Sequence, residues 1–157
     1  MGVIPAFSMT EYGTYGEEIV VPSSAAVSCP KELSSAVFAA VWMQYITAYG
    51  ALVDIGAVKR GDYVVITAAS SSVGLAAIQI CLALGAVPIA TTRTAAKREA
   101  LLKSGARNVI VTQEQDLPAE VHKITGGSGA RIVFDPVAGS YVEKLAEATE
   151  SWTAVSQ

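Results

Sequence analysis

The chain has 157 residues, of which 52% are hydrophobic and only 16% are charged, and its formal net charge at pH 7 is −3. This length suits one domain with an appendage, and the low charge is typical of a parallel sheet covered by helices. The scattered basic residues form no patch that would indicate a nucleic-acid partner. Cys29 and Cys81 are far apart and unpatterned, and no basic segment precedes an apolar core at the N-terminus. We therefore expect free thiols in a reducing cytoplasm.

The first third of the chain changes character near residue 33. Residues 1–32 are expected to be rich in hairpins, because glycines and prolines separate short strand-like pieces such as residues 18–21. From residue 33 to 53, apolar residues recur at helical spacing, with Ser34 and Ser35 as candidate caps and Gly50 as an interruption. We expect residues 33–60 to be linker helices that lead into a second domain.

The rest of the chain alternates between strand and helix patterns. Strands are expected at residues 63–67, 87–92, 108–112 and 131–134, each followed by a helix, at residues 73–84, 95–103, 117–124 and 141–148. Such alternation predicts an α/β fold with a doubly wound parallel sheet and right-handed crossovers. The first strand should lie between the second and the fourth, and the third beyond the second. The apolar fourth strand would then form an edge, so we expect self-association and a homo-oligomer.

One uncharged run in this region raises the question of a membrane span. No charge occurs between Tyr63 and Thr92, but Gly85 and Pro88 divide the run into a helix and a strand. Each piece is too short to cross a bilayer of about 30 Å. We therefore expect no contact with a membrane.

Residues 68–74, AASSSVG, form a small-residue turn that opens the first of these helices. Free backbone N–H groups and the helix dipole favour phosphate at such a place. Counting back from Gly74, the first two glycines of a G-x-G-x-x-G pattern fall on Ala69 and Ser71, so only Gly74 is kept. The turn alone fits an ordinary strand-to-helix connection equally well, and the flanking βαβ pattern is what favours a nucleotide. The residues expected to bind the cofactor here are Ala69, Ser70, Ser71, Ser72, Val73 and Gly74.

Several segments match one family in order and at normal spacing. They are VPSSAAVSCPKELS, ITAYGAL, GAVKRGDYVVI, LLKSGARNVI and ITGGSGARIVFDPVAG, together with A-x-x-G-x-x-G on Ala68, Ser71 and Gly74, where Ser71 departs from the pattern. The chain resembles the medium-chain dehydrogenase/reductase superfamily, and within it the zinc-free, quinone oxidoreductase-like branch. The resemblance implies a remnant of a GroES-like β domain at residues 1–32 and a partial Rossmann NADP-binding domain of about four strands at residues 61–157. It also implies that the chain is truncated at both ends.

The residues after the second expected strand indicate which nicotinamide cofactor is used. An NAD site has an Asp or Glu about 20 residues past the glycines. Here that place holds Thr91, Thr92 and Arg93, with Lys97 and Arg98 one turn on and no acid before Glu99. Cations and hydroxyls suit a 2′-phosphate, which favours NADP(H). The family resemblance places its phosphate-binding lysine on Lys97. The alternative is a solvated helix start whose cations are there by chance.

Two further strand ends are expected to contact the cofactor, because ligands of open α/β sheets bind beyond the carboxyl ends of strands. These contacts are Thr112, after the third strand, and Val137, after the fourth, where Val137, Ala138 and Gly139 are expected to flank the nicotinamide ribose. Asp135 ends the fourth strand at the same edge, where a role at the cofactor site and a role in forming the turn before Pro136 explain it equally well.

No metal site is expected. The chain distantly resembles zinc-dependent alcohol dehydrogenases at residues 47–50, and their zinc-binding Cys lies four residues before the Thr that matches Thr47. Met43 stands there, and a thioether is a poor zinc ligand. Family resemblance makes Thr47 a candidate contact of the nicotinamide, while the catalytic residues stay unknown. His122, in the middle of a helix, is expected to be structural.

These residues lead to one main hypothesis and two alternatives. The main hypothesis is a zinc-independent, NADPH-dependent oxidoreductase that passes a hydride to a small quinone or conjugated carbonyl. The first alternative is a nucleotide-binding domain without turnover, and the second is an interaction module that has lost the cofactor. The sequence leaves open whether this chain is active by itself.

Overall fold

The structure is a computed structural model that describes residues 1–150 apart from residues 5 and 9. It contains two compact units, residues 1–46 and the part that begins at Thr47. The helix α1 (Ser35–Tyr49) runs across this division. Each unit is described separately below, and the domain boundaries expected from sequence stay a prediction.

The first unit has little regular structure before α1. Strand β1 (Gly2–Val3) pairs antiparallel with β2 (Ala26–Val27), and a 3₁₀ turn η1 (Ser23–Ala25) precedes β2. The expected strand at residues 18–21 is wrong, because these residues lie in a loop. Their β-branched side chains carry strand propensity, but Val20 is 82% exposed and has no neighbouring strand against which to pack. Ser34 caps α1 as expected, since its hydroxyl accepts from the amide of Val37 at 3.3 Å.

The helical segment continues past Gly50 instead of ending there. Residues Gly50–Ile55 form a π-helical turn, η2, in which the amide of Gly56 donates to the carbonyl of Ala51 at 2.9 Å. By length and composition, Ser35–Ile55 is the one helical stretch of the described residues that could cross a membrane, a test that core helices of soluble proteins also pass. Sequence reasoning missed this stretch, having considered residues 63–92 instead, and these divide into strand, helix and strand as expected.

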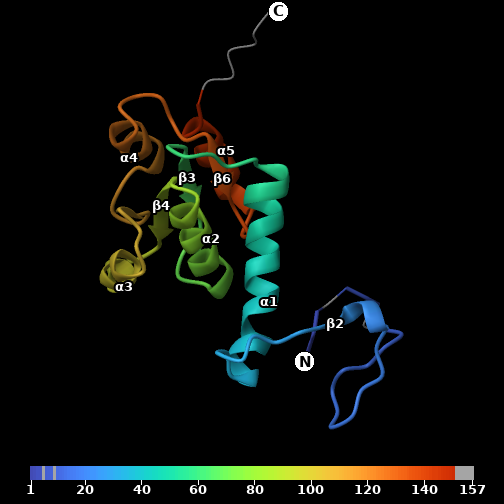
Figure 1. The fold of residues 1–157 in the computed structure, drawn as a ribbon. Coiled ribbons are helices and arrows are strands. Elements are labelled where there is room, and N and C mark those ends of the chain that lie inside the picture. Colours follow the sequence, from blue (N-terminus) through green and yellow to red (C-terminus); the bar gives the residue numbers. More distant parts are fainter. Residues whose placement is uncertain (5, 9, 151–157) are drawn as a thin grey trace, which may run out of the picture. The chain divides into compact units, whose positions relative to one another are not determined.

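The second unit is built on a four-stranded parallel sheet (Figure 1). Its strands are β3 (Tyr63–Ile66), β4 (Val87–Thr92), β5 (Asn108–Val111) and β6 (Ile132–Phe134), in the order β5-β4-β3-β6. The helices that follow them are α2 (Ser72–Ala83), α3 (Arg98–Lys103), α4 (Leu117–Ile124) and α5 (Val142–Glu147), and 3₁₀ turns η3 (Ala95–Lys97) and η4 (Gly139–Tyr141) precede α3 and α5. This order confirms the predicted doubly wound arrangement, with β6 at one end of the sheet.

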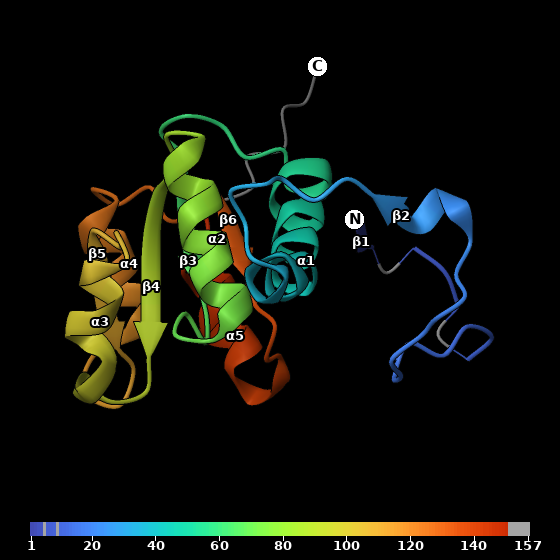
Figure 2. The ribbon, with the colours of Figure 1, turned by 60° about the horizontal axis from the view of Figure 1, so that its bottom comes forward.

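Helices cover both faces of this sheet. On one face, Val65, Ile89 and Ile110 of three adjacent strands pack with side chains of α4 and α5. Helix α2 contacts β3 and β4 and lies in front of β3 in Figure 2. Neighbouring residues of a strand point to opposite faces, yet Val64 and Ile66 are as fully buried as Val65. Both faces of β3 are therefore covered. The strands therefore contribute apolar side chains to the core, and polar side chains gather where the strands end.

The start of α2 lies unusually close to the turn that follows β3. A Cβ atom added at Gly74 would lie 2.7 Å from the carbonyl oxygens of Ala68 and Ala69 and from the Cα of Ala69. These are backbone atoms, which cannot rotate away. A side chain at Gly74 would therefore force the helix from the sheet, as the glycine pattern predicts.

Replacing Gly74 by alanine is expected to lower the free energy of unfolding by about 1–3 kcal/mol, the usual range for an overpacked site. Urea denaturation followed by circular dichroism measures this change. Ser72→Ala, in the same turn of the helix but exposed, is the control and should stay within about 0.5 kcal/mol of wild type. Equal free energies of unfolding for Gly74→Ala and wild type would contradict this prediction, because the backbone at Ala68 and Ala69 would then move aside without cost.

Candidate functional site

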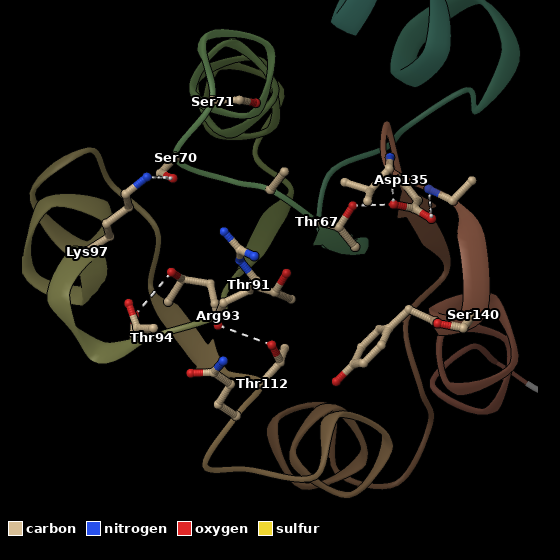
Figure 3. A pocket seen from close by; sticks show the side chains of 16 residues that line it. Thr67, Ser70, Ser71, Thr91, Arg93, Thr94, Lys97, Thr112, Asp135 and Ser140 are labelled. Atoms are coloured by element: carbon tan, nitrogen blue, oxygen red, sulfur yellow. Dashed lines mark hydrogen bonds between the residues drawn. The ribbon is translucent and has the colours of Figure 1, made fainter.

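A cavity of about 1030 Å³ opens at the carboxyl ends of the parallel strands. Every strand of the sheet contributes to its wall through the residues that follow it. Figure 3 shows their side chains converging on one space. The lining residues are Thr67, Ala68, Ser70, Ser71, Thr91, Thr92, Arg93, Thr94, Lys97, Thr112, Gln113, Asp135, Val137, Ala138, Ser140 and Tyr141.

The N-terminus of α2 supplies hydrogen-bond donors at one side of this cavity. Ser71 is its N-cap, and its hydroxyl oxygen accepts from the amide of Gly74 at 3.1 Å. The amides of Ser72 and Val73, as the first two of the helix, have no intrahelical acceptor. The hydroxyl proton of Ser71 and these two amides are thus suited to an anionic group.

The segment after β4 brings positive charge to the cavity. Arg93 is exposed and, in Figure 3, reaches toward the middle of the cavity beside Thr91. The ammonium of Lys97 donates to the hydroxyl of Ser70 at 3.2 Å, which links η3 to the turn after β3. The hydroxyl of Thr92 donates to the carbonyl of Thr94 at 3.2 Å. Thr92 therefore shapes the segment that carries the cations, and a direct bond from it to a phosphate would require a change of partner.

The ends of β3 and β6 meet through a side-chain hydrogen bond. The hydroxyl of Thr67 donates to the carboxylate of Asp135 (Figure 3). The same carboxylate accepts from the amides of Val137 and Ala138, each at 3.1 Å. Ala138 has φ 57° and ψ −155°, a conformation that residues with a Cβ rarely adopt. Asp135 is thus the turn-former that the sequence suggested, and it also joins two strands.

Of the residues expected from sequence to bind the cofactor, the cavity brings together Ser70, Ser71, Thr92, Arg93, Lys97, Thr112 and Val137. The others, Ala69, Ser72, Val73 and Gly74, do not line it. Ala69, in the turn, and Gly74, in the first turn of α2, are buried. Thr47 lies exposed on α1 and is also absent from the cavity wall.

Sequence reasoning placed Thr91 at this site but did not identify Thr67, Ala68, Thr94, Gln113, Ser140 and Tyr141 as site residues. One signal could have found most of them. They lie at or just past the ends of predicted strands, and the ends of parallel strands share one edge of the sheet.

Other reactive side chains lie outside the cavity. The ring nitrogens of His122 face the carbonyl oxygens of Gly127 and Glu147, at 3.3 and 2.9 Å, so this residue joins α4 to the end of α5. Cys81 is fully buried in α2. No group of three or more metal-ligating side chains comes together within the described residues.

The family of the chain follows from its sequence match. A profile of the family described as zinc-binding dehydrogenase matches residues 72–155, from the first turn of α2 onward. The chain belongs to the medium-chain dehydrogenase/reductase superfamily. Within this superfamily it is quinone oxidoreductase-like, as its sequence motifs indicate.

Similar members of the superfamily carry several names. The human synaptic vesicle membrane protein VAT-1 homolog is 36% identical over 84% of this chain and 33% of its own length. Quinone oxidoreductase 1 of Escherichia coli is 34% identical over 83% of this chain and 40% of its own length. A solved mycobacterial protein complexed with NADPH matches 84% of this chain and 41% of its own, with a TM-score of 0.77 and 29% identity. The chain therefore spans about a third to two fifths of the length of these two curated relatives.

The two cysteines are expected to differ sharply in reactivity. Burial raises the pKa of Cys81 from 9.0 to about 12, because desolvation disfavours the thiolate. Ellman's reagent should modify only the half-buried Cys29 in the native protein at pH 8, and both thiols after denaturation. As the pH rises from about 9 toward 12, the Cys81 thiol ionises in the unfolded chain before it ionises in the folded protein. The free energy of unfolding should therefore fall over that pH window. Two native thiols reacting at one rate would contradict this placement.

Proposed function

We propose that this chain is the nucleotide-binding part of an NADPH-dependent oxidoreductase that delivers hydride to a small quinone or conjugated carbonyl compound. The observation that supports this most is the pair of cations, Arg93 and Lys97, beside the cavity that follows β4. At this place an NAD site has a carboxylate that binds the ribose 2′-hydroxyl. A 2′-phosphate is the group that distinguishes NADPH from NADH, and cations favour it.

The residues around the start of α2 fit the pyrophosphate of such a cofactor. Gly74 allows the helix to approach the turn so closely that any Cβ would fill the space. The amides of Ser72 and Val73 and the hydroxyl of Ser71 then form a cradle of donors, and the positive end of the helix dipole adds to it. Ser71 replaces a family glycine, and its hydroxyl offsets the added bulk by donating a hydrogen bond.

The residues at the cavity have roles in binding, while the reaction chemistry comes from the cofactor. When bound, NADPH supplies the hydride. Arg93 and Lys97 would hold its 2′-phosphate, and Lys97 has two further N–H donors beside the one that Ser70 accepts. Relatives named quinone oxidoreductase and 2-haloacrylate reductase support an acceptor with a polarised double bond.

Zinc independence is part of the proposal. It is supported by Met43, which stands where the resemblance to zinc-dependent alcohol dehydrogenases would place a cysteine ligand. The family profile bears the name zinc-binding dehydrogenase, so the chemistry of this position is what argues for the metal-free member. NADPH binding without turnover is the second candidate function, supported by Thr47 lying outside the cavity.

Replacing Arg93 by alanine should weaken NADPH binding roughly ten- to a hundred-fold. A hydrogen bond to a charged group contributes about 1.5–3 kcal/mol, and each 1.4 kcal/mol is about tenfold in Kd. NADH, which has no charge at that place, should bind almost as it does to wild type. Lys97→Ala should act in the same direction but less than additively, because both cations face one phosphate. Calorimetric titration of both cofactors measures these effects.

Arg98→Ala is the matched control for that experiment. Arg98 is the first residue of α3, is exposed, and does not line the cavity, so its loss should leave both affinities unchanged. If NADPH and NADH bind wild type equally, or weaken equally on Arg93→Ala, the NADP assignment fails. NADPH consumption with a panel of quinones and enones then separates turnover from binding alone.

Protein purified without a metal-binding tag should contain far less than one zinc per chain by elemental analysis. The reason is the thioether at Met43, which is a weak ligand beside thiolate and imidazole. A ratio near one would refute zinc independence. Met43→Cys is the matched variant and should also bind no stoichiometric zinc, because the described residues bring together no group of three metal-ligating side chains that one added thiolate could complete.

A further inference from the structure

We propose that Thr67 and Asp135 are positioning residues that hold the turn at residues 136–139 in a strained shape, so that its backbone binds the nicotinamide half of the dinucleotide. This inference rests on the proposed function. It goes beyond that proposal because it assigns a role to two side chains at the opposite end of the cavity from the cations. Neither would form a bond to the reacting atoms.

The bond between Thr67 and Asp135 lies at the topological switch point of the sheet. The order β5-β4-β3-β6 runs away from β3 in two directions. Helix α2 leaves β3 on one side, while α5, which follows β6, packs on the face that Val65 and α4 share. Connections that leave neighbouring strands toward opposite faces open a crevice between the strand ends, and ligands bind there. The hydrogen bond joins the two strands at the base of this crevice.

The carboxylate of Asp135 orients the next two peptide groups. It accepts from the amides of Val137 and Ala138 and from the Thr67 hydroxyl, so three donors offset its charge. In a trans peptide the N–H and C=O point in opposite directions. The amide of Ala138 therefore turns the carbonyl of Val137 away from the carboxylate, on backbone that lines the cavity. That carbonyl is an acceptor for a ribose hydroxyl or a carboxamide N–H.

The shape of this turn is costly and is not explained by packing. Ala138 has φ 57° and ψ −155°, a region suited almost only to glycine. Residues 136–140 are all exposed, so no buried side chain requires the conformation. Strain of this kind persists only where the surroundings impose it, and it concentrates at ligand-binding turns. Here the bonds to Asp135 impose it, and Thr67 fixes the rotamer of Asp135.

The test compares a whole dinucleotide with a fragment that lacks the nicotinamide half. Calorimetric titration uses NADPH and adenosine 2′,5′-bisphosphate against wild type and Thr67→Val, which removes the hydroxyl at nearly constant volume. We expect NADPH to bind roughly tenfold more weakly and the fragment to bind unchanged. Thr67→Ser, which restores the hydroxyl, should recover NADPH affinity. Asp135→Asn, which keeps one acceptor oxygen, should give an intermediate loss with the same ligand selectivity.

Thr125→Val controls for a general loss of stability. Thr125 is also buried, and its hydroxyl bonds to the backbone of His122 and Gly129, away from the cavity. This variant should lower the thermal midpoint but leave both affinities unchanged. The inference is overturned if Thr67→Val weakens both ligands equally, or leaves NADPH unaffected, because either result makes the bond merely structural.

The NADP assignment and the role of Thr67 can fail separately in these titrations. If wild type binds NADPH and NADH equally, the NADP assignment fails, and the same comparison made with NADH and ADP still tests Thr67. If wild type binds neither dinucleotide, the inference fails together with the proposed function. Arg93→Ala should weaken both NADPH and the bisphosphate fragment, because both carry the 2′-phosphate, whereas Thr67→Val should weaken NADPH alone.

Discussion

The approach of α2 to the turn after β3 is the constraint on which the rest of the second unit depends. Gly74 leaves no room for a Cβ against Ala68 and Ala69, so the helix begins directly above the strand end. The amide of Ala69 in turn donates to the carbonyl of Thr91 at 3.3 Å, which ties the turn to β4. One close backbone contact thereby aligns the donors of α2 with the cations that follow β4.

Charge is distributed unevenly along the cavity. Arg93 and Lys97 lie at the end of β4, whereas the carboxylate of Asp135 lies two strands away, after β6. Three hydrogen-bond donors satisfy that carboxylate, so it repels an anionic ligand less than a free one would. A dinucleotide whose phosphates face β4 and α2 and whose uncharged end faces β6 fits this pattern. The proposed function and the role of Thr67 thus depend on the same arrangement of strands.

Strong periodic patterns were predictable, and isolated strand-like pieces were not. The four strands of the sheet follow from alternation of apolar runs with helices, since buried parallel strands need helical crossovers, and their order follows from the doubly wound dinucleotide-binding arrangement. Residues 18–21 have comparable β-propensity but form no strand, because a strand exists only where a partner offers hydrogen bonds. The π-helical turn after Gly50 was equally hidden, since a local pattern shows an interruption but not how the helix continues.

At the site, the sequence by itself determined the phosphate turn, the cations after β4 and the missing acid, because each is read over a few consecutive residues. Only the tertiary structure decided that Thr67 reaches Asp135, 68 residues later in the chain, and that the hydroxyl of Thr92 is occupied by Thr94. It also placed Ala138 in a conformation that its own side chain opposes. These features arise from contacts between strands that are neighbours in space, and local sequence carries no record of which strand ends will meet.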